Sequence, residues 1–373
     1  MLKEAIGCAL KILCTFTPKT NVIFESVPDF SDNTRAVFDE LVARGYNKKY
    51  KFVWLTHGDN QQIPDVQNMK CVSIRSIWGI LHMAFSKAMI FCNTIMPSSP
   101  KHQFAMFLDH GTPLKDTSKY TKLPKGTYYL SSSEESVPIR SRILKISETD
   151  RVTALGFPRN DVFSKPKIDI GQYFCGNFKK IIVWYPTFRQ HKRKNRIDGG
   201  NALPLLHNLE WARRFNDLLV QENVLVILKP HYAQDISQIL NLKLSNVLFI
   251  DDSFFTTHGI TSYQFLHACD AMITDYSSVY YDYLLCDNPI GLIWEDIEEY
   301  KNGIGLVDEY EYLCKGGEKI YTIDDLCRFI EDVSGGVDNL KTERKEICQW
   351  AHYSSDGHST ERVVNYIVEK AGL

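Results

Sequence analysis

Short apolar runs alternate with amphipathic stretches along most of the chain. Apolar runs of four to eight residues predict buried strands, and apolar residues at helical spacing predict helices. Strands that alternate with helices are typical of a doubly wound parallel sheet. In the first half the pattern predicts strands over Asn21–Ser26, Tyr50–Thr56, Ala88–Cys92, Thr127–Ser131 and Val152–Leu155, with helices over about Thr34–Arg44 and Ser76–Ser86.

The same alternation returns after a polar stretch, Ser164–Gly171, which is the candidate domain boundary. The second series predicts strands over Lys180–Tyr185, Val224–Leu228, Val247–Ile250 and Ala271–Thr274, with helices near Leu209–Glu222, Asp235–Leu242 and Ser262–Cys269. The predicted fold class is therefore α/β, with two Rossmann-like doubly wound lobes that face a cleft.

Chain length agrees with two lobes, because 373 residues exceed the size at which one hydrophobic core usually suffices. We predict an N-terminal lobe over residues 1–165 and a C-terminal lobe over 166–345. Residues 346–373 hold a last helix, about Ser359–Lys370, which we expect to fold back on the first lobe.

Composition narrows the function classes. The chain is 44% hydrophobic and 24% charged, as soluble globular domains are, and its formal net charge of -2 argues against bulk nucleic-acid binding. Its ten cysteines are scattered without a Cys-x-x-Cys spacing, which favours buried thiols in a reducing cytosol over disulfides or zinc. We predict no metal site and no cofactor.

The segment Thr274–Ser278 carries the first candidate chemistry. It follows an apolar run and precedes another, which indicates a strand that feeds a helix. Ser277 and Ser278 would then lie at the first turn of that helix, where backbone N–H groups and the helix dipole favour a phosphate. The alternative is that Asp275 or Ser277 is only a helix cap.

Two histidines follow apolar runs in the same way. His110 ends the run before Gly111, and His231 comes just after Val224–Leu228 and Lys229. Ligands of open α/β sheets bind at the carboxyl ends of strands, and histidine titrates near neutrality, as a general base should. A single histidine is more often structural or merely exposed, but two at strand ends favour a site.

Six motifs in order resemble the CDP-glycerol glycerophosphotransferase family, which builds teichoic acids and related capsule polymers. The resemblance extends from about Asn21 to the C-terminus. The sequence has Asp109 and Phe188 at two positions where the family more often has Trp, and the first affects the packing around His110. The motifs are Asp109–Lys115, Gly156–Asp161, Tyr185–Arg189, Lys229–His231, Asp275–Ser278 and Asp356–Arg362.

This resemblance implies the two-lobed glycosyltransferase-B architecture and metal-independent transfer of an alditol phosphate. The donor would be CDP-glycerol or CDP-ribitol, and the acceptor a hydroxyl of a lipid-linked or oligosaccharide primer. His110 is assigned as the base and His231 as the group that stabilises the phosphates, although the reverse is chemically open. Donor phosphate ligands would be Ser277, Ser278, Lys229, Arg189, Asp275 and Arg362.

Three residues are assigned to the acceptor or to the orientation of His110, namely Arg159, Asp161 and Thr112. For Arg159 and Asp161 the alternative is an ordinary turn with a capping carboxylate. Two other functions stay open on the sequence: a sugar-nucleotide glycosyltransferase of the same fold, and a surface-binding module without catalysis.

The chain has no apolar stretch long enough to cross a bilayer. Leu2 to Phe16 forms an apolar helical pattern with lysines at other positions, and Ser76 to Ser86 forms one with basic flanks. Each fits either packing inside the domain or contact with a membrane surface. The basic loop Gln190–Gly200 is either a solvated surface or a site that attracts an anionic acceptor or lipid headgroups. We predict peripheral association with the cytoplasmic face of the membrane.

Overall fold

The computed structural model describes residues 10, 12–58, 63–119, 121–146, 151–187, 190–191, 196–197, 203–230, 243–303 and 305–373. The chain divides into two compact units. Unit 1 comprises residues 1–112, 118–165 and 351–373, and unit 2 comprises 113–117 and 166–350. The sequence-based boundaries were 165/166 and 345/346, and the roles assigned to the lobes stay predictions.

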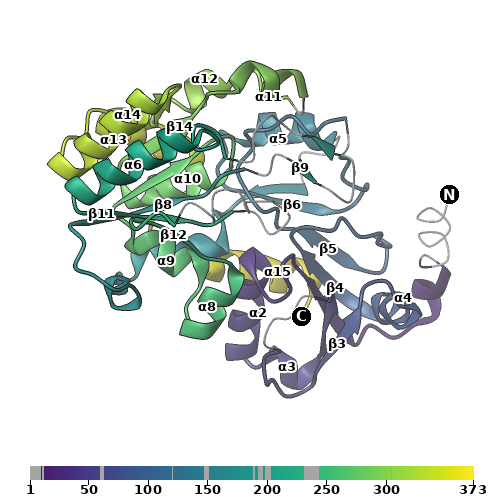
Figure 1. Cartoon of the computed structure of the whole chain (residues 1–373). Coiled ribbons are helices and arrows are strands. Elements are labelled where there is room, and N and C mark those ends of the chain that lie inside the picture. Colours follow the sequence, from purple (N-terminus) through teal and green to yellow (C-terminus); the bar gives the residue numbers. More distant parts are fainter. Residues whose placement is uncertain are drawn as a thin grey trace. The chain divides into compact units, whose positions relative to one another are not determined.

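Unit 1 is built on a seven-stranded sheet of order β3-β2-β1-β4-β5-β6-β7, and every pairing in it is parallel (Figure 1). Its central strands are buried on both faces, which explains why they appear in the sequence as continuous apolar runs. The strands are β1 Asn21–Glu25, β2 Lys51–Thr56, β3 Met69–Ser73, β4 Ser86–Phe91, β5 Phe104–Phe107, β6 Tyr128–Ser131 and β7 Val152–Ala154.

Helices cover both faces of this sheet. One core joins alternate strand residues to α2 and to the last helix, α15, and a second core lies on the opposite face against α4. Helix α15 packs in the unit 1 core, so the C-terminal helix belongs to the same unit as the N-terminal strands. The helices of unit 1 are α2 Asp32–Ala43, α3 Tyr46–Lys49, α4 Ile77–Ala84, α5 Val137–Leu144, the 3-10 helix η2 Pro158–Ser164 and α15 Ser359–Ala371.

Unit 2 repeats the design with a six-stranded parallel sheet of order β12-β11-β8-β13-β14-β15. Its core packs alternate residues of the strands against α6 and α13. The strands are β8 Lys180–Trp184, β11 Val224–Leu228, β12 Val247–Phe249, β13 Ala271–Thr274, β14 Ile290–Ile293 and β15 Glu318–Ile320, and β9 Gln190–His191 and β10 Arg196–Ile197 form a separate hairpin.

The helices of unit 2 follow its strands. The longest, α6 and α13, begin with side-chain caps from Asn208 and Thr322, which satisfy backbone N–H groups of the first turn. The helices of unit 2 are η3 Gly171–Tyr173, α6 Leu209–Gln221, α8 Asp252–His258, α9 Ser262–Ala268, α10 Val279–Tyr283, η4 Leu284–Cys286, α11 Ile297–Gly303, α12 Tyr310–Leu313, α13 Ile323–Gly335 and α14 Lys341–Ala351. Helix α14 ends at the unit boundary.

The two parallel-sheet α/β units confirm the predicted fold class as far as the architecture of each unit is concerned. The predicted strands and helices match observed elements to within two residues at each end, apart from Asp235–Leu242, which lies outside the described residues. The motif Gly156–Asp161 is partly helical, because Pro158 begins the 3-10 helix η2, whose first four residues are buried. Strands β3, β14 and β15 had not been predicted, β5 was expected only as the apolar run before His110, and β9 and β10 lie in the segment Gln190–Gly200 that was predicted as a loop.

The two apolar segments near the amino end are only partly packed. On α4, Met83 and Ala84 are buried while Ile77 and Trp78 stay exposed. Residues 12–16 are helical, and of these Cys14 is buried whereas Phe16 is 83% exposed. Each segment therefore packs through part of its apolar surface, and contact of the exposed part with a membrane stays a prediction. Among the described residues, no helix has the length and apolar character needed to span a membrane.

Candidate active site

Each sheet has one point where the strand order reverses direction. In unit 1 it lies between β1 and β4, and in unit 2 between β8 and β13. Neighbouring loops leave such a point in opposite directions, which opens a crevice at the carboxyl ends of the strands where ligands of this fold class bind. His110 follows β5, beside β4, and Asp275–Ser278 follows β13 directly.

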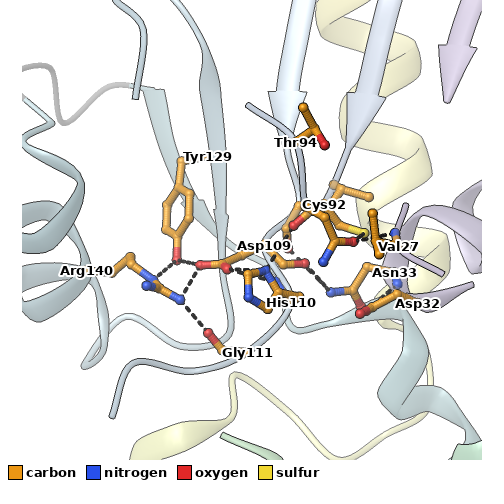
Figure 2. Close-up of polar contacts among 12 residues, drawn as sticks. Val27, Asp32, Asn33, Cys92, Thr94, Asp109, His110, Gly111, Tyr129 and Arg140 are labelled. Atoms are coloured by element: carbon orange, nitrogen blue, oxygen red, sulfur yellow. Dashed lines mark hydrogen bonds and ion pairs between the residues drawn. The ribbon is translucent and has the colours of Figure 1, made fainter. Parts of the chain in front are cut away.

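His110 is the exposed titratable group at this edge of unit 1. Its side chain is 55% exposed, and its ring Nδ1 lies 3.1 Å from the backbone oxygen of Cys92, at the end of β4 (Figure 2). A carbonyl only accepts hydrogen bonds, so Nδ1 is the protonated nitrogen of the neutral ring. The lone pair is then on Nε2, which is the nitrogen available to act as a base.

Asp109 lies directly behind the histidine and is buried, with a φ of 55°. Its Oδ2 accepts a hydrogen bond from the Tyr129 hydroxyl at 2.9 Å and forms an ion pair with Arg140 at 2.5 Å. Its Oδ1 faces His110, 2.7 Å from the backbone nitrogen and 3.4 Å from ring Nδ1. Figure 2 shows these side chains pointing toward one another.

Arg159 and Thr112 hold the backbone around His110. The Arg159 guanidinium donates to the backbone oxygen of His110 at 2.9 Å and to Asp32 at 2.7 Å, and only 9% of the residue is exposed. The Thr112 hydroxyl is buried and lies 2.9 Å from the hydroxyl of Ser132. The Arg159 contacts are those of a residue that orients His110, which was one of its two predicted roles.

Asp161 caps α15. Its two carboxylate oxygens accept hydrogen bonds from the backbone nitrogens of Ser359 and Thr360, each at 2.8 Å. The geometry corresponds to the capping alternative left open by the sequence, although the capped helix begins 198 positions further along the chain. This contact ties η2 to the last helix.

Replacing Asp161 with Ala is expected to destabilise the protein by about 1–2 kcal/mol, because two buried backbone N–H groups lose their acceptor. Urea or thermal unfolding measures the change. Glu134→Ala, which removes an exposed carboxylate from the same unit, is the control and should change stability by less than about 0.5 kcal/mol. Equal stability of the two variants would contradict the capping role.

Arg362 also lies in unit 1, with its guanidinium already engaged. It donates to the backbone oxygen of Leu155 at 3.1 Å, to Asp356 at 2.7 Å and to Ser359 at 3.0 Å. The hydrogen bond from Arg362 is the main cause that lowers the pKa of Asp356 to about 2. These contacts fix the turn before α15, and the predicted contact of Arg362 with the donor stays untested.

In unit 2, Ser277 and Ser278 stand where the sequence predicted them, between β13 and α10. Both are half-buried, and Ser278 is the N-cap residue of α10 although its side chain makes no capping hydrogen bond. The hydroxyl of Ser277 accepts only a long contact, 3.4 Å, from the nitrogen of Val279. Both hydroxyls can therefore turn toward an anion at this sheet edge.

Asp275 braces the two strands on either side of the switch point. It is buried, and its carboxylate accepts hydrogen bonds from the backbone nitrogen of Thr187 at 2.9 Å and from the Thr187 hydroxyl. Thr187 follows β8, so this contact fixes the Tyr185–Thr187 segment against the Ser277–Ser278 turn. A negative group would repel a phosphate that it touched, so these contacts suit a structural brace, and the predicted contact of Asp275 with the donor stays untested.

Lys229 follows β11 and is mostly buried. Its ammonium lies 3.0 Å from Asp252, the first residue of α8, and 5.8 Å from the centre of the Tyr185 ring. A phosphate at this edge would compete with Asp252 for the ammonium. Arg189 and His231, the other two residues predicted nearby, lie outside the described residues.

Sequence reasoning missed a second histidine at the carboxyl edge of the unit 1 sheet. His57 follows β2, and its Nε2 lies 2.9 Å from the fully buried carboxylate of Glu25, the last residue of β1. The same carboxylate accepts hydrogen bonds from the backbone nitrogens of Asn93 at 3.3 Å and Thr94 at 3.0 Å. Glu25 ends an apolar strand without any motif, so only the strand order could have revealed the pair.

No group of three or more His, Cys, Asp or Glu side chains that could hold a metal occurs among the described residues. The described cysteines are all in the free thiol form. Burial raises the pKa of Cys92 well above its usual value, so the thiol beside the His110 anchor stays protonated and unreactive.

The chain is similar to known proteins over almost its whole length. The model of the CDP-Glycerol:Poly(glycerophosphate) glycerophosphotransferase family matches residues 9–369. The chain belongs to this family. It is therefore a transferase, and the resemblance inferred from the six motifs is confirmed.

Individual relatives are distant but extend over almost the whole chain. A teichoic acid poly(glycerol phosphate) polymerase of Bacillus spizizenii is 25% identical over 382 residues, with 93% of this chain and 91% of the relative covered. A teichoic acid glycerol-phosphate transferase of Staphylococcus aureus is 24% identical, with coverages of 98% and 97%. A teichoic acid ribitol-phosphate primase of Bacillus spizizenii is 25% identical.

The fold is also similar to that of a solved structure. A solved structure of the wall teichoic acid polymerase TagF superposes with a TM-score of 0.73 at 18% sequence identity, covering 99% of this chain and 94% of that chain. At this identity the likeness shows the fold alone. The relatives themselves are enzymes of teichoic acid synthesis, and their names include both glycerol phosphate and ribitol phosphate.

Proposed function

We propose that the chain transfers glycerol phosphate, or a related alditol phosphate, from a CDP-activated donor to a hydroxyl of a lipid-linked or polymer acceptor. The observation that carries the proposal is His110, whose ring is anchored through Nδ1 and exposed at the carboxyl edge of the sheet in a chain that belongs to the glycerophosphotransferase family. The exposed imidazole supports a role as general base.

The chemistry divides between the two units. Nε2 of His110 takes the proton of the acceptor hydroxyl, and the oxygen attacks the donor phosphorus that carries the glycerol. The bond from that phosphorus to the bridging oxygen breaks, and cytidine monophosphate leaves as an anion. Unit 2 holds the diphosphate through the hydroxyls of Ser277 and Ser278, the first turn of α10 and the Lys229 ammonium.

Chain connectivity supports the participation of both units in one reaction. Three residues after His110 the chain enters unit 2 at Pro113. The backbone oxygen of Pro113 accepts a hydrogen bond of 3.3 Å from the Tyr281 hydroxyl, in the helix that Ser278 begins. In the proposed glycosyltransferase-B architecture, unit 1 serves the acceptor and unit 2 the donor. His231 and Arg189 would add positive charge on the donor side.

Membrane association is part of the proposal. Ile77 and Trp78 on α4 and Phe16 on the first described helix expose apolar side chains on unit 1. Such side chains suit a surface that contacts lipid, where a lipid-linked acceptor would be met. This supports the peripheral location predicted from the sequence.

Calorimetric titration with nucleotide donors tests the proposed function. We expect heat of binding with CDP-glycerol or CDP-ribitol and an increase in melting temperature at saturating donor. UDP-sugars and GDP-sugars should give neither. Binding of a UDP-sugar or GDP-sugar without binding of any CDP-alditol would replace the proposal with the glycosyltransferase alternative.

A further inference from the structure

The proposed function leaves one buried charged cluster of unit 1 without a role. Asp109, Tyr129 and Arg140 form a closed set of contacts behind His110 (Figure 2). Besides binding Asp109, the Arg140 guanidinium donates to the Tyr129 hydroxyl at 3.1 Å and to the backbone oxygen of Gly111 at 2.7 Å. The cluster therefore holds the residue before His110 and the residue after it.

The two carboxylate oxygens of Asp109 have different partners. Oδ2 is held by Tyr129 and Arg140, so it cannot rotate toward the histidine. Oδ1 is left facing His110, at 2.7 Å from the backbone nitrogen and 3.4 Å from ring Nδ1. Nδ1 also lies 3.1 Å from the oxygen of Cys92. The ring nitrogen on the inner side thus meets two acceptors and no donor.

The charges of the cluster are fixed. Burial alone would lower the pKa of Arg140, but the Asp109 carboxylate and Tyr129 raise it, and the net result is a guanidinium that stays charged. Burial, together with the Asp109 charge, raises the pKa of Tyr129 well above its usual value, so the phenol stays a neutral donor. The negative end of a buried ion pair is therefore directed at the inner side of His110.

We propose that Asp109, clamped by Tyr129 and Arg140, is a positioning residue that holds the proton of His110 on Nδ1 and stabilises the imidazolium formed when Nε2 accepts the acceptor's proton. The inference rests on the proposed role of His110 as base. The backbone supports it: Asp109 is in the left-handed region, which costs free energy and is maintained here by the buried clamp.

Asp109→Asn is the direct test, because it keeps the shape of the side chain and removes the charge. The kcat for transfer from CDP-glycerol should fall about 10- to 100-fold with little change in KM, as is usual when the partner that orients a functional histidine is lost. In the His110→Ala background the same change should have no further effect, because Asp109 acts through the imidazole. Asp39→Asn, on the exposed side of α2, is the matched control and should keep the wild-type kcat.

A spectroscopic readout separates this proposal from the proposed function. With 15N-labelled histidine, the wild-type ring of His110 should show a protonated Nδ1 and an unprotonated Nε2 at neutral pH. Asp109→Asn should shift the ring toward a mixture of tautomers. This measurement needs no turnover, so it stands even if no CDP-alditol is a substrate.

A milder variant covers the case in which Asp109→Asn fails to fold because Arg140 loses its partner. Tyr129→Phe keeps both charges and removes one hydrogen bond to Oδ2, and it should lower kcat about 2- to 10-fold. The proposal is overturned if either folded variant keeps the wild-type kcat and histidine spectrum, or if Asp109→Asn causes the same loss in the His110→Ala background.

Discussion

Replacement of His110 with Ala is expected to lower kcat about 10²- to 10⁴-fold, the range that a general base contributes. The imidazole is 55% exposed, and among the described residues its polar contacts are with Cys92 and Asp109, so the fold should tolerate the change. The affinity for CDP-glycerol should stay close to that of the wild type, because the proposed donor ligands belong to unit 2. Single-turnover transfer from labelled CDP-glycerol at saturating donor measures the effect.

His102→Ala is the matched control for this experiment. His102 is an exposed histidine of the same unit, on the turn before β5, and its removal should leave kcat unchanged. If His110→Ala transferred glycerol phosphate as fast as His102→Ala, His110 would not be the base. His231 would then be the candidate base, because the sequence allowed the roles of His110 and His231 to be exchanged.

Removal of both hydroxyls in a Ser277→Ala/Ser278→Ala double variant is expected to weaken CDP-glycerol binding about 10- to 100-fold. Hydrogen bonds to a charged group contribute about 1.5–3 kcal/mol, and each 1.4 kcal/mol corresponds to a factor of ten in Kd. The serines make almost no internal hydrogen bonds, so the variant should unfold at nearly the wild-type temperature. Calorimetric titration with CDP-glycerol gives the Kd.

The exposed residue Ser245, elsewhere in unit 2, provides the control as Ser245→Ala. Its Kd for CDP-glycerol should equal that of the wild type. Equal Kd values for the control and the double variant would show that the turn after β13 does not hold the donor phosphates. Asp275 would then be a brace for the fold alone.

The strands that were predicted well are those whose signal is contained in their own residues. Val224–Leu228 and Ala271–Thr274 were predicted to the residue, because a strand buried on both faces of a parallel sheet is a continuous apolar run. Strand β14 was missed because it has only four residues and contains Gly291, which weakens the strand signal. Strand β15 has only three residues and begins with Glu318 and Lys319.

The candidate site shows the same division. His110 and the Ser277–Ser278 pair could be predicted because each directly follows an apolar run and lies in a recognisable motif. The contacts of Asp109 with Tyr129 and Arg140, and of Glu25 with His57, depend on which strands lie side by side, and no local pattern encodes strand order. Asp161 is the clearest case, since the helix that it caps is almost 200 residues away in the sequence.

The proposed mechanism assigns the base to unit 1 and the binding of the donor to unit 2. Titration of CDP-glycerol into the His110→Ala protein tests this claim most directly. We expect a Kd within about twofold of the wild-type value, because the donor is bound by unit 2 and its binding does not need the base. A Kd raised as far as in the Ser277→Ala/Ser278→Ala variant would contradict it, because His110 would then be a donor ligand.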